Sequence, residues 1–171
     1  MISQQKYIKE LLKRFEMESS KTIHTPIATA TRLDMDEPSF PVNETMYRGI
    51  IGSLLDPTAS RLGIVFIVGL CSRFQSSPKE YHLKVAKTIL RYLKGMRDLV
   101  LYYPSGYTFD IIGYVDADYA GYLVDRKSAS GMTHFWGSCL ISWGTKKQNT
   151  VAISTADAEY VAVASCCAQL L

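Results

Sequence analysis

Several features that define common protein classes are missing from this sequence of 171 residues. The cysteines show no Cys-x-x-Cys pair and no His/Cys ligand spacing, which argues against a zinc site and favours buried free thiols in a reduced compartment. The longest apolar run, Ile64 to Cys71, is far too short to span a bilayer, and the start lacks the pattern of a secretory signal. We therefore expect an intracellular protein, cytoplasmic or nuclear, with no membrane partner.

The sequence also carries little net charge. Its 19 Lys and Arg residues against 16 Asp and Glu give a formal charge of +3, which permits nucleic-acid binding without requiring it. Bases outnumber acids in residues 1–99, whereas acids outnumber bases in residues 100–171. A phosphate-binding surface is therefore expected mainly in the first part, and a metal-dependent acidic site in the second.

Apolar residues at helical spacing dominate the first part of the chain. They predict helices over residues 5–16, 44–53, 63–74 and 78–94, the last with Ser77 as N-cap and Pro78 at its first position. Pro57 interrupts an apolar stretch, so a helix boundary is expected there. Residues 19–42 lack this periodicity and contain prolines, which predicts a linker or an extended loop.

After Gly95 the apolar pattern becomes strand-like. It predicts strands at residues 99–103, 109–115, 132–136, 140–143 and 150–153, followed by a last helix that Ser154 and Asp157 cap. This order predicts an α+β fold, with a helical segment over residues 1–98 and an antiparallel meander with one packed helix over residues 99–171.

Two acidic residues are the main candidates for chemistry. Asp116 ends an apolar strand, a common way of presenting a carboxylate to a divalent cation. A helix packed across the sheet can place Glu159 beside it, and two carboxylates held close repel each other unless a cation neutralises them. A structural role is the alternative, because Asp157 and Glu159 also suit the positive end of a helix dipole.

Ordered motifs across most of the chain resemble the Pol polyproteins of Copia-type retrotransposons. They occupy residues 47–55, 58–61, 74–79, 89–95, 113–121, 126–131, 141–148 and 154–160. The most distinctive are Gly113-Tyr-Val-Asp-Ala-Asp-Tyr-Ala-Gly121 and Ser154-Thr-Ala-Asp-Ala-Glu-Tyr160. The resemblance implies the C-terminal part of a reverse transcriptase over residues 1–98 and the N-terminal half of a ribonuclease H-like domain over residues 99–171.

The resemblance also implies roles for particular residues. Asp116 and Glu159 match members of the acidic set that binds Mg²⁺ and cleaves the RNA strand of an RNA/DNA hybrid, so both are expected to be catalytic and metal-binding. Asp118 is expected either at a turn or in a position that supports the metal-binding residues. The pairs Arg126-Lys127 and Lys146-Lys147 are candidate contacts to the hybrid backbone, although charged pairs on turns are more commonly solvated surface.

The chain departs from the family pattern in two places. The polymerase Tyr-x-Asp-Asp motif is absent, and residues 160–171 contain no acid, so the third and fourth carboxylates of the acidic set are missing. We therefore expect a fragment that is inactive alone and acts, if at all, with the remainder of the Pol polyprotein.

The alternative to an enzyme fragment is a module that binds nucleic acid or a protein without catalysis. Its contact surface would be the basic helix face of Lys84, Lys87, Arg91 and Lys94. The aromatic residues Tyr114, Phe135, Trp136 and Trp143 are expected in the core rather than at a base-stacking surface, and His134 is assigned no chemistry.

Overall fold

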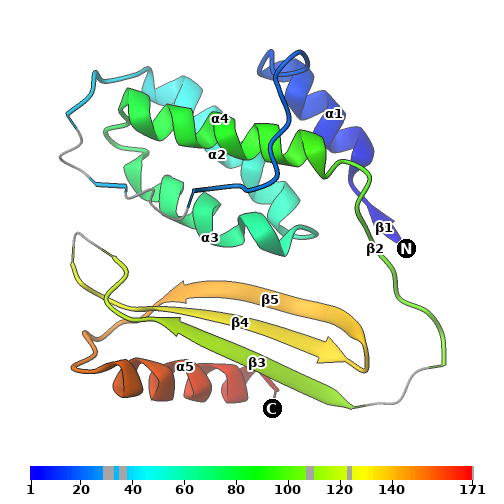
Figure 1. Ribbon diagram of the computed structural model, residues 1–171, viewed down its shortest axis with the longest axis vertical. Coiled ribbons are helices and arrows are strands. Elements are labelled where there is room, and N and C mark those ends of the chain that lie inside the picture. The colour runs from blue at the N-terminus through cyan, green and yellow to red at the C-terminus, as the bar shows by residue number, and fades with distance from the viewer. Residues whose placement is uncertain (29–32, 35–37, 107–109, 123–124, 171) are drawn as a thin grey trace. The chain divides into compact units, whose positions relative to one another are not determined.

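The computed structural model describes residues 1–28, 33–34, 38–106, 110–122 and 125–170. The chain divides into two compact units, Met1–Leu101 (unit 1) and Tyr102–Leu171 (unit 2). Unit 1 is mainly helical, and unit 2 combines an antiparallel sheet with one helix, as Figure 1 shows. The α+β class expected from the sequence is therefore confirmed.

Unit 1 packs four helices around a core of large apolar side chains. They are α1 (Gln5–Arg14), α2 (Glu44–Thr58), α3 (Leu62–Cys71) and α4 (Glu80–Gly95), with a 3₁₀ turn, η1 (Ser72–Phe74), after α3. Residues from all four helices are fully buried, among them Ile8, Leu54, Ile64 and Leu90. Burying each such side chain contributes roughly 1.5–3 kcal/mol, so the hydrophobic effect dominates the stability of this unit.

The helix α2 continues through Pro57, where the sequence predicted a boundary. Proline has no N–H, so the carbonyl of Ser53, four residues earlier, loses its usual helical partner. The Tyr7 hydroxyl of α1 donates to this carbonyl oxygen at 2.8 Å. Burial, together with the nearby Asp56 carboxylate, raises the pKa of Tyr7 to about 12. A donor from another helix thus replaces the one that Pro57 lacks.

The helix α4 begins at Glu80, so the prediction of Ser77 as its N-cap was wrong. The backbone around Pro41 forms an antiparallel bridge with Lys79, whose φ of −115° and ψ of 167° are extended rather than helical. The N–H of Glu80 also donates to a carbonyl of this earlier segment. Pairing with a distant segment therefore keeps Pro78 and Lys79 extended and delays the start of the helix.

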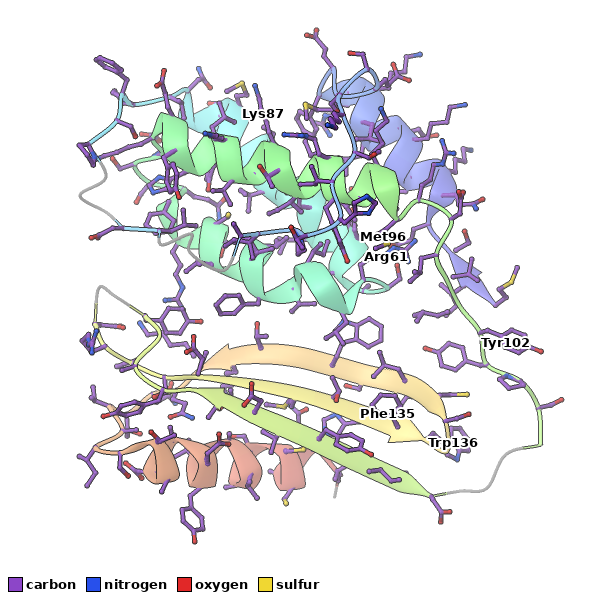
Figure 2. All side chains as sticks on the ribbon, viewed as in Figure 1. Arg61, Lys87, Met96, Tyr102, Phe135 and Trp136 are labelled. Carbon is purple, nitrogen blue, oxygen red and sulfur yellow. The ribbon has the colours of Figure 1, made fainter. Side chains whose placement is uncertain are left out.

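Two short strands close unit 1. β1 (Ile2–Ser3) and β2 (Val100–Leu101) pair antiparallel, so the strand predicted at residues 99–103 pairs with the N-terminal segment and does not extend the meander of unit 2. Arg61 stabilises this arrangement, because its buried guanidinium donates to the Leu99 carbonyl at 2.7 Å. Figure 2 labels Arg61 near the end of the helical unit, in the region where α4 leads into β2.

Unit 2 contains a three-stranded antiparallel sheet in the order β3 (Ile111–Asp118), β4 (Ala129–Trp136) and β5 (Cys139–Lys147). The helix α5 (Thr155–Leu170) packs against β3 and β4 and runs along β3 in Figure 1. The predicted start of the first of these strands, Phe109, lies outside the described residues. The fold thus places the strand that carries Asp116 next to the helix that carries Glu159.

The strand predicted at residues 150–153 is absent from the described structure, and the prediction was wrong. These residues lead into α5 instead. The Ile153 N–H donates to the Asp157 carboxylate at 3.1 Å, and the Asp157 N–H donates to the Ser154 hydroxyl at 3.1 Å. The helix cap predicted from Ser154 and Asp157 is therefore confirmed, and it leaves the Ile153 N–H no part in a strand ladder.

Candidate functional site

Asp116 lies near the end of β3 with its side chain exposed. Cross-strand pairing sets it opposite Gly131 of β4, and Gly131 opposite Thr145 of β5. Successive side chains on a strand point to opposite faces, and paired residues share a face. Asp116, Tyr114 and Asp118 therefore belong to one face of the sheet, which we call the Asp116 face.

The helix α5 covers the other face. A Cβ atom at Gly113 would come within 2.8 Å of the Cys166 Sγ and 3.0 Å of a Leu170 methyl carbon, so the helix packs directly on this glycine. Because Gly113 and Asp116 differ by an odd number of positions, their Cβ directions are opposite. The Asp116 side chain therefore starts on the face that α5 does not cover.

Glu159 lies in α5, on the second turn from the capping residue Ser154, and is half-buried. Its neighbour Ala158 is fully buried against the sheet. Among the described residues, no group of three or more His, Cys, Asp or Glu side chains is arranged to hold a metal ion. The structure thus brings the two predicted carboxylates into one unit, on adjacent elements, without forming such a group around them.

A buried glutamine that sequence reasoning missed connects these elements. The Gln148 side-chain amide donates to the Ser130 hydroxyl at 3.0 Å and to the Ala158 carbonyl at 2.8 Å. Its backbone N–H donates to the Ser128 carbonyl at 2.9 Å, and the Ser128 hydroxyl accepts from the Ala120 N–H at 3.1 Å. This network ties the turn after β3, the start of β4 and the first turns of α5 together. Its only sequence signal was the place of Gln148 in the motif at residues 141–148.

Three other acidic residues of unit 2 have structural contacts. The Asp118 carboxylate lies so close over Gly121 that a Cβ atom there would overlap it. Asp157 caps α5. Asp125 forms an ion pair with Lys147, and this hydrogen-bonded ammonium lowers the pKa of the Asp125 carboxyl below its ordinary value. These contacts agree with the turn role that the sequence suggested for Asp118.

The four cations predicted to bind nucleic acid have different surroundings. Besides its ion pair, Lys147 places its ammonium 5.3 Å from the centre of the Tyr122 ring. The Lys127 ammonium donates to the Asn149 carbonyl at 2.6 Å. Arg126 and Lys146 are exposed. Lys127 and Lys147 therefore already make contacts within the chain that connect the β3–β4 turn to the end of β5.

The basic face of α4 is partly engaged in the same way. Lys94 donates to the carbonyls of Glu18 and Ser20, both at 2.6 Å, and Arg91 donates to the Lys21 carbonyl at 2.8 Å. Lys87 is exposed on α4 and is labelled in Figure 2. Arg91 and Lys94 thus hold the segment that follows α1, which leaves less of this face for a nucleic acid.

The expectation that the aromatic residues of the sheet lie in the core is wrong for two of them. Tyr114 and Trp136 are 60% and 43% exposed, so they are not core residues. Tyr114 instead packs edge-on against Phe135, with ring centres 5.7 Å apart, and Figure 2 labels Phe135 and Trp136 at one end of the sheet. His134 is buried, and its Nε2 lies 3.5 Å from the Cys166 Sγ, so it contributes to the contact between sheet and helix.

The cysteine thiols are free, as the sequence predicted, but they are not all buried. Cys71 and Cys166 are buried, whereas Cys139 is half-buried and Cys167 is exposed. Among the described residues, no helix is both long and apolar enough to cross a membrane.

Comparison with known proteins connects these features to a family. The chain is 38% identical, over 96% of its length, to the retrovirus-related Pol polyprotein from transposon RE1 of Arabidopsis thaliana. It is 37% identical, over 94% of its length, to the corresponding polyprotein from transposon TNT 1-94 of Nicotiana tabacum. The chain belongs to the Copia-type Pol polyprotein family.

This Copia-type chain spans only 11% and 13% of those two polyproteins. It is also 30% identical, over 99% of its length, to an uncharacterized mitochondrial protein of Arabidopsis thaliana, of which it covers 70%. No family model matches the chain. No solved structure matches it either.

Proposed function

We propose that unit 2 of this Copia-type chain is the first part of a ribonuclease H-like domain that acts on RNA/DNA hybrids. In this proposal unit 1 is the C-terminal part of the reverse transcriptase that precedes it. The similarity to Pol polyproteins over nearly the whole chain is the observation that carries the proposal. Asp116 and Glu159 would belong to the acidic set of the domain.

The placement of the two acidic residues supports this assignment in part. Asp116 is held within the paired part of the sheet, opposite Gly131 of β4, which is in turn opposite Thr145 of β5. Glu159 follows Ala158, whose carbonyl Gln148 anchors to the sheet. Both carboxylates are therefore carried by backbone that packing and hydrogen bonds keep in place, as a catalytic group requires.

Mg²⁺ is the cofactor that the family resemblance implies, but the described residues do not by themselves fit it. Mg²⁺ demands near-octahedral oxygen coordination, and this chain shows no described group of three candidate ligands. Asp116 also starts on the sheet face opposite to the one that α5 covers. We propose that the remainder of the Pol polyprotein supplies the missing carboxylates, and that the chain alone does not cleave.

A cleavage assay tests this proposal. An RNA/DNA hybrid labelled on its RNA strand is incubated with Mg²⁺ and either this chain or a longer polypeptide from the same reading frame. We expect the longer polypeptide to cut the RNA and to lose this activity with Asp116→Asn or Glu159→Gln. The chain alone should cut no faster than its own Asp116→Asn variant.

Two results would contradict the proposal. Strong cleavage by the chain alone, lost in Asp116→Asn, would show that it needs no further carboxylates. A longer polypeptide that folds but leaves the hybrid intact would show that the domain is not ribonuclease H-like.

Binding of nucleic acid without cleavage is the second candidate function. The exposure of Arg126 and Lys146, together with the absence of a described metal-binding group, is the observation that favours it. Salt-dependent binding of the hybrid by the chain, combined with no cleavage by the longer polypeptide, would support this candidate.

A further inference from the structure

The turn between β3 and β4 is fastened to the end of β5. Asp125 pairs with Lys147, and Lys127 donates to the Asn149 carbonyl. Within the turn, the Arg126 N–H donates to the Tyr122 carbonyl at 2.7 Å. We call residues 125–127 and 146–149 the basic corner. These contacts within the chain hold the backbone of the basic corner in place without a ligand.

Arg126 is the unusual residue of this corner. Its φ of +55° lies in the left-handed region, which a side chain with a Cβ atom rarely adopts and which favours glycine. Its guanidinium is exposed and makes no hydrogen bond or ion pair with any residue in the described parts of the chain. A strained backbone position that presents an unpaired cation at a fixed place is the kind of outlier from which a functional role is inferred.

The charges of the corner favour an anionic partner. Lys147 neutralises Asp125, so Arg126 and Lys127 leave an excess of positive charge in the turn itself. Lys146 is paired with Ser130 and belongs to the face that α5 covers, so it does not contribute there. Cross-strand pairing sets Lys147 opposite Ala129, and Ala129 opposite Asp118. Paired residues share a face, so the ion pair lies on the Asp116 face, one row of the sheet beyond Asp116.

We propose that Arg126 contacts a backbone phosphate of a nucleic acid bound at the Asp116 face, while Lys127 and Lys147 hold the turn in shape. That this nucleic acid is an RNA/DNA hybrid rests on the function proposed above. The planar guanidinium can donate two parallel hydrogen bonds to one phosphate. The fastened turn reduces the conformational entropy lost on binding.

The decisive variant is Arg126→Gly. Glycine adopts a positive φ without strain, so this variant should fold at least as stably as the parent chain. Binding is measured by fluorescence anisotropy with a labelled RNA/DNA hybrid, in EDTA and over a series of KCl concentrations. We expect several-fold weaker binding at low salt, and a slope of log K against log salt that is smaller by about one, as the loss of one phosphate contact requires.

Three further variants separate this role from general charge loss and from folding. Arg126→Lys keeps the charge and should keep most of the salt slope. Lys9→Ala removes one exposed cation from α1 and should leave the slope unchanged. Lys147→Ala should lower the melting temperature of unit 2 and change the slope less than Arg126→Gly does.

The outcomes distinguish this inference from the proposed function. A salt slope for Arg126→Gly equal to that of the parent overturns the inference, even if the longer polypeptide cleaves the hybrid. A reduced slope with no cleavage by the longer polypeptide supports the inference and contradicts the proposed function. Failure of the parent chain to bind either the hybrid or a DNA duplex of the same sequence also overturns the inference.

Discussion

The two units of this chain differ in what fills their interiors. Unit 1 buries large apolar side chains, including Ile50, Leu54 and Leu90. The buried residues of unit 2 are mostly small or polar, as Ala158, Ala162, Ser128, Ser130, His134 and Gln148 show. Apolar burial stabilises unit 1 in proportion to area, whereas each buried polar group of unit 2 needs a hydrogen-bond partner.

This difference indicates how each unit tolerates change. Removing apolar volume should damage unit 1 most, and removing a hydrogen-bonding group should damage unit 2 most. Two spectroscopic probes separate the units, because both tryptophans, Trp136 and Trp143, lie in unit 2. Tryptophan fluorescence therefore reports on unit 2, whereas helical circular dichroism is weighted toward unit 1.

The largest effect is expected for Leu54→Ala. It removes a fully buried side chain from the core of unit 1 and should cost about 2–5 kcal/mol of unfolding free energy. In urea, the circular dichroism transition should shift to lower denaturant concentration while the tryptophan transition stays in place. The matched control is Met132→Ala in unit 2, which should shift the tryptophan transition instead. Equal shifts of both probes by Leu54→Ala would contradict the separation of the two cores.

Gln148→Leu tests the polar interior of unit 2. It removes the donors to Ser130 and Ala158 and should cost about 1–3 kcal/mol, measured by the tryptophan transition. Gln75→Leu, which removes a local bond to the Ser72 carbonyl in unit 1, is the control and should cost less. If Gln148→Leu leaves the tryptophan transition unchanged, the network does not hold α5 on the sheet.

Tyr7→Phe tests a hydrogen bond that joins two helices of unit 1, α1 and α2. The change leaves the Ser53 carbonyl without its donor and should cost about 0.5–1.5 kcal/mol. Pro57→Ala restores a backbone N–H that can donate to the same Ser53 carbonyl. The Tyr7→Phe change should therefore cost less unfolding free energy in the Pro57→Ala background than in the parent chain. Additive effects in the double-mutant cycle would show that Tyr7 does not replace the donor that Pro57 lacks.

The same bond makes the stability of unit 1 depend on alkaline pH. The folded-state pKa of Tyr7, about 12, exceeds the ordinary value of 10.0, so the neutral hydroxyl is favoured in the folded state. The contribution of the neutral Tyr7 hydroxyl to the unfolding free energy is complete below pH 10 and is lost as the pH rises toward about 12. Urea midpoints measured by circular dichroism over this range should fall more steeply for the parent than for Tyr7→Phe.

The smallest effect is expected at the half-buried ion pair of Asp125 and Lys147 in unit 2. The pKa of Asp125 is lowered in the folded state, so its contribution is present above the ordinary pKa of Asp and is lost as the pH falls through the lower folded value. Asp125→Asn should remove this acid-dependent part of the tryptophan-detected stability. An unchanged acid profile in Asp125→Asn would assign the acid sensitivity of unit 2 to another carboxyl group.

The sequence predicted those elements that local pattern determines. Apolar periodicity gave the helices of unit 1, and Ser154 with Asp157 marked the start of α5, because caps and amphipathic faces are local properties. It missed the start of α4 and the continuation of α2 through Pro57. Both depend on partners far away in sequence, the segment around Pro41 and the hydroxyl of Tyr7.

The candidate site was predictable to a smaller extent. The motifs identified Asp116 and Glu159 as candidates, and their catalytic and metal roles stay predictions. Which face Asp116 occupies depends on where α5 packs, and that follows from the close contact at Gly113 rather than from any single motif. The roles of Gln148 and His134 also require knowledge of their partners on α5.

The contact at Gly113 has a consequence at the level of the gene. Every amino-acid replacement that a single-base change can produce at a glycine codon introduces a Cβ atom. At this position that atom would lie 2.8 Å from the Cys166 sulfur, so the cysteine side chain or α5 itself would have to move. One nucleotide is therefore enough to disturb the packing of the helix that carries Glu159, so the coding sequence at this codon offers a sensitive record of whether a copy of the element is still under selection to fold.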